Sequence, residues 1–499
     1  MRQLATLILF ILPIVITAQD LSQGLKINDL EVHPMQDVPK PNYLESYVDP
    51  SFGTTIRRIT KANEGGIIVP MFSTIQAWNA DESLMIVYDR NKGIHQLLNG
   101  KTYQFIRPLN DFRPIDIDQI FWDFNDPDIL YYPDIQTDDF VKYNVRSGIR
   151  SVIANLRELS DCNGSLEMGN DVQMMSWDSN VFSFRCGNET AYMYNISTGE
   201  LTSFKIEEVD RVAPAVAPSG KRFIHRNKIY DTTGNQMTNL NKESNEHSCI
   251  GQLPNGQDAY FAIAFAQGPQ GGCIGDIIAH NLESGDCFPV ISQNQGYDYP
   301  QAGTHISALA HKNTEGGWVA ASMIGYNEDG QSLLDQELVI ARAEEGNVEV
   351  CRIGHHRSDE NEFDYWGEPH AVISPTGTRV LFASDWSGAE DGKSIDCYVV
   401  ELPAYQALTT STRQTPVLDN AVEVYPNPVH QESRLSFSNP TNKNYTLRIT
   451  NVTGQQLAVS KIVSSEYTIK QKDFEAGLYF FYLIDEEGNG SKGKFIIGK

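Results

Sequence analysis

Residues 355–386, HHRSDENEFDYWGEPHAVISPTGTRVLFASDW, decide the fold. The second half is an apolar strand, a Ser-Pro-x-Gly turn at 374–377 and a second apolar strand, which is how a propeller blade opens. The first half gathers polar and aromatic side chains in one connecting loop: His355, His356, Arg357, Trp366, Glu368 and His370. A polar loop on a rigid repeat scaffold is a common location for binding or chemistry.

The same strand-turn-strand pattern recurs along the chain. Each copy is an apolar strand, a tight polar turn and another apolar or aromatic strand. The copies begin near Ser73, Asp118, Val172, Ala213, Ile250, Ile306 and Ala371. Their spacing suits four-stranded blades of ~40–50 residues, and no helical periodicity competes with it. Seven copies predict an all-β chain whose residues 19–403 form a seven-bladed β-propeller.

Three further segments flank the repeats. Residues 1–18 have the charge, short apolar core and small-residue cleavage site of a signal peptide. Residues 404–420 are polar and Thr-rich, which predicts a linker. Residues 421–499 contain alternating strands and turns that predict a small β-sandwich. No later stretch is apolar enough to cross a bilayer, so we expect no stable membrane span.

Charge and cysteine usage restrict the function. The net charge is −25 and the chain has no basic run, which argues against nucleic acid as a partner. To bind an acidic polymer, the protein would need a local basic groove whose positive potential exceeds the negative potential of the rest of its surface.

The chain has seven cysteines, so at least one stays unpaired if the others form disulfides. Cys162 and Cys186 are a plausible disulfide; metal ligation and buried thiols are the alternatives.

Histidines mark the candidate site, since the chain carries no phosphate loop, dinucleotide fingerprint, HExxH or GxSxG motif and we expect no organic cofactor. Inner strands of a propeller begin at its channel mouth, where several of these side chains should converge. His247, His305 and His370 each stand just before a copy, and His225 sits in the second strand of the fourth copy. Tyr326 and Arg342 are neighbours on adjacent strands that would complete a set. A carboxylate pair for hydrolysis would come from Asp116, Asp118, Asp123 and Glu368.

Two groups of residues have the ligand chemistry of a structural zinc ion, because thiolate and imidazole together favour that metal. One group is Cys351, His356 and His370. The rival group is His247, Cys249, Cys273 and Cys287. Neither group has diagnostic spacing.

The tail resembles the C-terminal sorting domain of the type IX secretion system. The matching motifs are Tyr425–Pro428, Asn451–Gly454, Gly477–Tyr479 and Gly493–Phe495. The resemblance implies export across the outer membrane of a Bacteroidetes-type bacterium, with the type IX machinery as partner. The protein would then be secreted or attached to the cell surface. A carbohydrate-binding sandwich is the alternative interpretation of this tail.

Residues 45–403 resemble the short propeller-type ulvan lyases of marine bacteria. The likeness rests on the blade phrases, the 355–386 loop and the ordered series His225, His247, Tyr326 and Arg342. It implies a polysaccharide lyase that cleaves ulvan, an acidic, sulfated algal polysaccharide of rhamnose and uronic acids. The reaction would be β-elimination at the uronic acid, leaving unsaturated uronate ends.

The lyase chemistry suggests roles for these residues. Arg342 would neutralise the uronate carboxylate, which makes the C5 proton easier to remove. Tyr326 would act as base or acid, with His225 and His247 assisting proton transfer or holding the carboxylate. His305, Arg357 and Trp366 would bind substrate. We expect a monomer. A glycoside hydrolase and a non-catalytic glycan-binding propeller are the alternatives.

Overall fold

The chain divides into two compact units, Met1–Tyr405 and Gln406–Lys499. The computed structural model describes residues 20–167, 175–187, 190–206, 214–241, 247–264, 273–297, 303–325, 327–358, 364–386, 393–405, 422–437, 439, 443–451, 456–485 and 490–498. The predicted signal peptide therefore lies outside the described residues, as does nearly all of the predicted linker. In the described part of the chain, no helix has the length and apolar character needed to cross a membrane.

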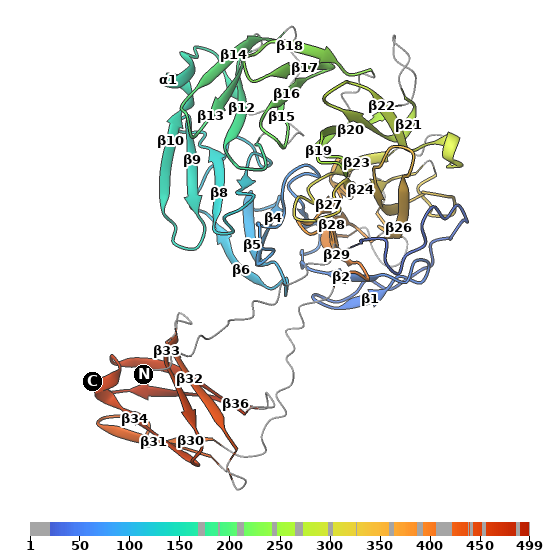
Figure 1. Ribbon diagram of the computed structural model, residues 1–499. Helices are drawn as coiled ribbons and strands as arrows, with labels where there is room; N and C mark the ends of the chain where they lie inside the picture. Colours follow the sequence, from blue (N-terminus) through green and yellow to red (C-terminus); the bar gives the residue numbers. More distant parts are fainter. Residues whose placement is uncertain are drawn as a thin grey trace, which may run out of the picture. The chain divides into compact units, whose positions relative to one another are not determined.

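The first unit is a ring of antiparallel sheets (Figure 1). Its described residues form seven sheets, six of four strands and one of five. The first three contain β3 (Ile68–Val69), β4 (Leu84–Asp89), β5 (Ile94–Asn99) and β6 (Phe105–Leu109); β7 (Phe121–Trp122), β8 (Ile129–Pro133), β9 (Asp139–Asn144) and β10 (Arg150–Asn155); β11 (Leu166–Glu167), β12 (Val181–Cys186), β13 (Thr190–Asn195) and β14 (Leu201–Lys205). The short helix α1 (Leu156–Ser160) follows β10.

The remaining sheets continue the same up-and-down order. They contain β15 (Ala215–Val216), β16 (Arg222–His225), β17 (Lys228–Asp231) and β18 (Gln236–Asn239); β19 (Cys249–Gln252), β20 (Asp258–Ala264), β21 (Gly275–Asn281) and β22 (Cys287–Ile291); β23 (Gly303–Ser307), β24 (Trp318–Met323), β25 (Glu337–Arg342) and β26 (Glu349–His355); β27 (Val372–Ile373), β28 (Arg379–Ser384) and β29 (Asp396–Glu401). The 3-10 helices η1 (Gln293–Gln295) and η2 (Asp364–Gly367) lie between sheets. The all-β class and the propeller predicted from the sequence are confirmed.

The ring is closed by the N-terminal part of the propeller. Strands β1 (Ser46–Val48) and β2 (Thr55–Arg58) join the last sheet, whose order is β1-β2-β29-β28-β27. In this register Ile56 of β2 pairs with Val400 of β29. The first and last strands of the propeller thus belong to one blade. The pairing of β2 with β29 uses backbone groups that would stay exposed at the ends of an open array.

The turn in the diagnostic stretch forms as predicted. Gly377 adopts a φ of +79°, which is accessible to glycine at little cost, and its N–H donates to the carbonyl of Ser374 over 2.8 Å. Strands β27 and β28 on either side are buried throughout. Trp78 and Trp122, two of the tryptophans at matching places in the repeats, are each 1% exposed in the cores of their blades.

Four of the seven cysteines form two disulfides. Cys162–Cys186 is confirmed, and a second bridge joins Cys273 to Cys287. The rival zinc group is therefore wrong, because both of these thiols are already used in a covalent bond. The remaining three, Cys249, Cys351 and Cys397, are buried free thiols.

The second unit is a two-sheet β-sandwich. One sheet has the order β30-β31-β34, from β30 (Glu423–Tyr425), β31 (Glu432–Ser436) and β34 (Glu466–Lys470). The other has the order β33-β32-β35-β36, from β33 (Gln456–Ile462), β32 (Tyr445–Asn451), β35 (Gly477–Asp485) and β36 (Gly490–Ile497). The 3-10 helix η3 (Gln471–Asp473) follows β34. Leu435, Leu447, Phe481 and Phe495 lie in a core that belongs to this unit.

Candidate functional site

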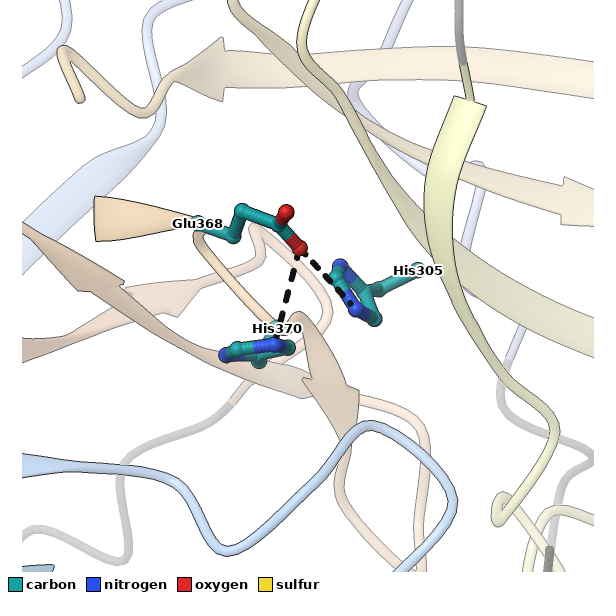
Figure 2. Close-up of side chains that lie close together, drawn as sticks. All are labelled: His305, Glu368 and His370. Carbon is teal, nitrogen blue, oxygen red and sulfur yellow. Dashed lines mark ion pairs between the residues drawn. The ribbon is translucent and has the colours of Figure 1, made fainter. Parts of the chain in front are cut away.

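Two neighbouring blades bring a carboxylate and two imidazoles together where their first strands begin. His305 lies in β23, whereas Glu368 and His370 lie between η2 and β27. Figure 2 shows the carboxylate of Glu368 turned toward both rings. Its Oε2 is 3.3 Å from Nε2 of His305 and 3.7 Å from Nε2 of His370. The ring centroids of the two histidines are 4.0 Å apart.

Both imidazoles are buried in an apolar setting. His305 is 0% and His370 is 2% exposed, and the ring of Phe72 packs against both at 5.2 and 5.4 Å. Burial, with smaller contributions from His370 and His247, holds the pKa of His305 well below its usual range. Burial also lowers the pKa of His370 to about 3. Both rings are therefore neutral at physiological pH, which is the form that binds metals.

A third histidine adjoins the pair. The ring of His247 is 4.6 Å from that of His305 in an edge-on arrangement, and it is partly exposed. His247 and His370 have φ angles of +50° and +46°, in the left-handed region that few residues other than glycine adopt. Such conformations cluster at functional sites because surrounding structure must hold them in place.

The Glu-Pro-His sequence explains how the loop presents its two side chains. Pro369 disfavours helical backbone at Glu368, and η2 ends at the residue before it, Gly367. The carbonyl of Pro369 accepts a hydrogen bond from the N–H of Ala383 over 2.7 Å, which fixes the loop to β28. His370 then enters the blade two residues before β27.

The cluster fits a divalent transition metal. The donor atoms of His305, Glu368 and His370 all lie within 4.8 Å of one another, which is compatible with ligands ~2.0–2.2 Å from a common ion. Within the described residues, none of the four ring nitrogens of His305 and His370 has a hydrogen-bond partner, although all are buried. Buried polar atoms normally have a partner. A metal ion bound by these nitrogens would account for their lack of a hydrogen bond. Two imidazoles with one carboxylate are a common donor set for zinc, iron and related ions.

One other group in the described residues has metal-compatible geometry: Asp29, Glu31 and His33. Here the carboxylate already has partners, because Asp29 bonds to His33 over 2.8 Å and pairs with Lys26 over 3.3 Å. This group is partly to fully exposed on the N-terminal segment. Its contacts are satisfied by protein groups and do not call for an ion.

The four residues predicted to be catalytic have different places in the structure. His247 lies in the cluster, as described above. His225 is buried at the end of β16, at the turn into β17. Tyr326 lies outside the described residues. In the register of this sheet, His305 of β23 pairs with Ser322 of β24, and Ser322 pairs with Leu338 of β25. Arg342 lies four residues beyond Leu338, which places it roughly 13 Å further along β25. Arg342 therefore lies away from the cluster. Its guanidinium forms an ion pair with the carboxylate of Glu344 over 2.8 Å.

Of the predicted substrate-binding residues, His305 is in the cluster and Trp366 is in η2 beside it, whereas Arg357 faces elsewhere. Arg357 is 2% exposed, donates to the carbonyl of Gln36 over 2.5 Å and lies over the ring of Trp386 at 5.5 Å. It holds the N-terminal segment against the last blade.

The predicted zinc group is not gathered in the structure. Of its members only His370 belongs to the cluster. Cys351 is buried in the core, where burial raises its pKa to about 12. Nε2 of His356 lies 2.9 Å from the carbonyl of Met323, and its Nδ1 accepts from the N–H of Ser358. Both nitrogens of His356 are thus engaged within the protein.

Sequence reasoning missed the pairing of Glu368 with His305. It placed Glu368 among possible hydrolase carboxylates, and the available signal was the Glu-Pro-His sequence directly before a blade. The carboxylate of Asp123 is otherwise engaged: it accepts the hydroxyl hydrogen of Tyr131 over 2.8 Å and the N–H groups of Asn125 and Asp126. Asp123 therefore has a local structural role.

Comparisons with known proteins agree with this architecture. Among solved structures, an oligogalacturonate lyase of Vibrio parahaemolyticus is similar, with 18% identity, a TM-score of 0.50, and 72% of this chain and 96% of that chain covered. An oligogalacturonate lyase in complex with manganese is 16% identical, with a TM-score of 0.49, and 75% and 99% of the two chains covered. At 18% identity, the likeness to the Vibrio parahaemolyticus structure shows the fold alone. No curated protein matches the chain.

The tail has a family match of its own. Residues 423–498 match the family described as the secretion system C-terminal sorting domain. The alternative of a carbohydrate-binding sandwich has no such support. The protein is therefore exported by the type IX route, and is secreted or attached to the cell surface.

Proposed function

We propose that the propeller is a lyase that cleaves a uronate-containing polysaccharide by β-elimination. The observation that carries this proposal is the arrangement of His305, Glu368 and His370, two neutral imidazoles and a carboxylate, with the partly exposed His247 against them. The mouth thus combines a cation site with a candidate base. The similar fold of an oligogalacturonate lyase supports the same class of reaction.

The reaction removes the C5 proton of a uronate and expels the oxygen at C4. The C5 proton is weakly acidic, because the electrons it leaves behind are delocalised onto a carboxylate that is already negative. A divalent cation held by His305, Glu368 and His370 would supply the positive charge that stabilises this developing anion. His247, whose ring adjoins His305, takes the proton, since histidine is the side chain that most often serves as a general base.

The leaving oxygen at C4 needs a proton in turn. Tyr326 and His225 are the residues we propose for this step, from their place in the series that resembles the ulvan lyases. The charge-neutralising role assigned to Arg342 would pass to the cation, because Arg342 lies further along its blade and pairs with Glu344.

Ulvan is the first substrate that we propose, on the sequence resemblance. Oligogalacturonate is the second, on the similar structure. Both carry a uronate with a glycosidic oxygen at C4, so the same proton abstraction applies to either.

A direct assay tests the proposal. Purified protein is stripped with a chelator, reloaded separately with Mn²⁺, Zn²⁺ or Ca²⁺, and mixed with ulvan or oligogalacturonate. A rise in the ultraviolet absorbance of unsaturated uronate is expected with at least one metal and one substrate. New reducing ends without this absorbance would instead indicate a hydrolase, and binding without cleavage would indicate a glycan-binding propeller.

Two variants test whether the activity depends on the cluster. His370→Ala should abolish the absorbance rise. His33→Ala is the matched control, since it removes a histidine from the other group with metal-compatible geometry in the described residues, and it should leave the rate unchanged. Equal loss in both variants would contradict the assignment of the site.

A further inference from the structure

Arg90 is an exposed cation held in a fixed place beside the cluster. It directly follows β4, and its guanidinium carbon lies 4.5 Å from the ring centroid of Trp366. Trp366 is itself packed against buried apolar residues that include Ile67 and Ala383. The backbone N–H of Arg90 donates to the carbonyl of Ile67 over 3.0 Å. The stacking on Trp366 and the backbone hydrogen bond to Ile67 together restrict a side chain that would otherwise move freely.

A second feature of Arg90 is its ion pairing. Across the described ranges, no carboxylate forms an ion pair with its guanidinium. The adjacent Asp89 is engaged by Lys92 over 2.7 Å and by Gln96 over 2.8 Å. In a chain with a net charge of −25, carboxylates are abundant, so a stacked arginine with no carboxylate partner among the described residues has the properties of a ligand-binding group.

An aromatic side chain connects Arg90 to the cluster. Tyr365 is 42% exposed, and its ring lies 5.4 Å from that of Trp366 and 5.0 Å from that of His370. The order in space is therefore Arg90, Trp366, Tyr365 and His370. Exposed aromatic rings are suited to the apolar faces of sugar rings.

We propose that Arg90, Trp366 and Tyr365 form a subsite for an anionic sugar residue that neighbours the reacting uronate. Arg90 binds the carboxylate or sulfate group with two parallel hydrogen bonds, Trp366 positions the guanidinium, and Tyr365 contacts the sugar ring. This inference rests on the proposed function in one respect, namely that the sugar chain enters at the His305–Glu368–His370 cluster. The subsite makes the enzyme selective for a substrate with two adjacent charged residues.

Binding is measured first, because it does not depend on catalysis. Calorimetry with short oligogalacturonates on the full chain should show Arg90→Gln weakening the affinity by ~10-fold or more. Arg90→Lys should recover part of it, since lysine keeps the charge but lacks the planar fork. Arg150→Gln is the matched control: Arg150 is also exposed and lies over an aromatic ring, that of Tyr143 at 5.9 Å, at the outer strand of another blade.

Three ligands then identify the anionic group. Oligogalacturonate offers carboxylates, its methyl ester offers none, and sulfated ulvan fragments offer both groups. Arg90→Gln should leave binding of the methyl ester unchanged. A loss with ulvan fragments alone would assign sulfate, and a loss with both charged ligands would assign carboxylate. Added salt should weaken wild-type binding more than binding by Arg90→Gln.

Failure of the subsite is distinguishable from failure of the proposed function. Full lyase activity with identical KM in wild type and Arg90→Gln would overturn the subsite and leave the lyase intact. Arg90-dependent binding without any unsaturated product would overturn the lyase and leave the subsite intact. Tyr365→Ala should raise KM with little change in kcat, whereas a role confined to folding would lower thermal stability at unchanged KM.

Discussion

The imidazole rings of His305 and His370 lie 4.0 Å apart, and no described residue forms a hydrogen bond with any of their four nitrogens. They come from different blades, and Glu368 lies within 3.7 Å of both. Two neutral bases in an apolar pocket beside a carboxylate are unfavourable unless a ligand satisfies them. This relationship is the basis of the first prediction.

Metal binding should depend on the cluster. Full-length protein reloaded after chelation should retain about one equivalent of a divalent metal by elemental analysis, with a raised melting temperature. Glu368→Gln keeps the shape but removes the charge, so we expect affinity to fall by ~10–100-fold. Retention of a full equivalent by His370→Ala, with loss in His33→Ala, would place the metal at Asp29 and His33 instead.

Replacement of His247 should separate metal binding from proton transfer. His247→Gln should lower kcat by ~10²-fold or more, because a positioned base typically contributes ~10²–10⁴-fold to a proton transfer. The metal content should remain that of the wild type, since His247 is not part of the three-donor group. A parallel loss of metal and rate would assign His247 as a ligand.

The stability of the propeller should depend on the protonation of Glu337. This side chain is 0% exposed, and burial raises its pKa from 4.5 to about 8 despite the attraction of Arg352, whose Nε is 3.5 Å away. The folded state therefore holds the proton more tightly than the unfolded state. Its contribution to the free energy of unfolding is fully present below pH 4.5 and is lost as the pH rises to about 8.

Glu337→Gln mimics the protonated form, so its melting temperature relative to wild type should rise between pH 5 and pH 8, a window set by these pKa values. Glu349→Gln, on the neighbouring strand, is the control and should show no such trend. A constant difference between Glu337→Gln and wild type across this range would refute the assignment.

Removal of the tail should affect export and spare the propeller. The described residues of the sandwich have a hydrophobic core of their own, which includes Leu447 and Phe481 and no residue of the first unit. A chain ending at Tyr405 should keep its melting transition and its rate on substrate, yet remain inside the native host. Secretion of the truncated chain at the wild-type level, measured in the culture medium and at the cell surface, would contradict the sorting role.

Local signals in the sequence were sufficient for much of the fold. Alternating apolar strands with polar turns, such as the turn ending at Gly377, predicted the blades because strand and hairpin formation depends on neighbouring residues. The Cys162–Cys186 disulfide and the sorting tail were also predicted correctly, each from residues close together in the chain or from a compact motif. His247, His305 and His370 were expected at one mouth because inner strands all begin there.

The tertiary structure alone decided which side chains meet. The contact of His305 with Glu368, and the stacking of Arg90 on Trp366, join blades whose relative placement depends on closure of the ring by β2 and β29. Arg342 was grouped with the histidines on sequence order, yet its strand carries it to the other end of the blade. A strand's local pattern determines that it forms and which face is buried, whereas its long-range register determines where along the blade each residue lies.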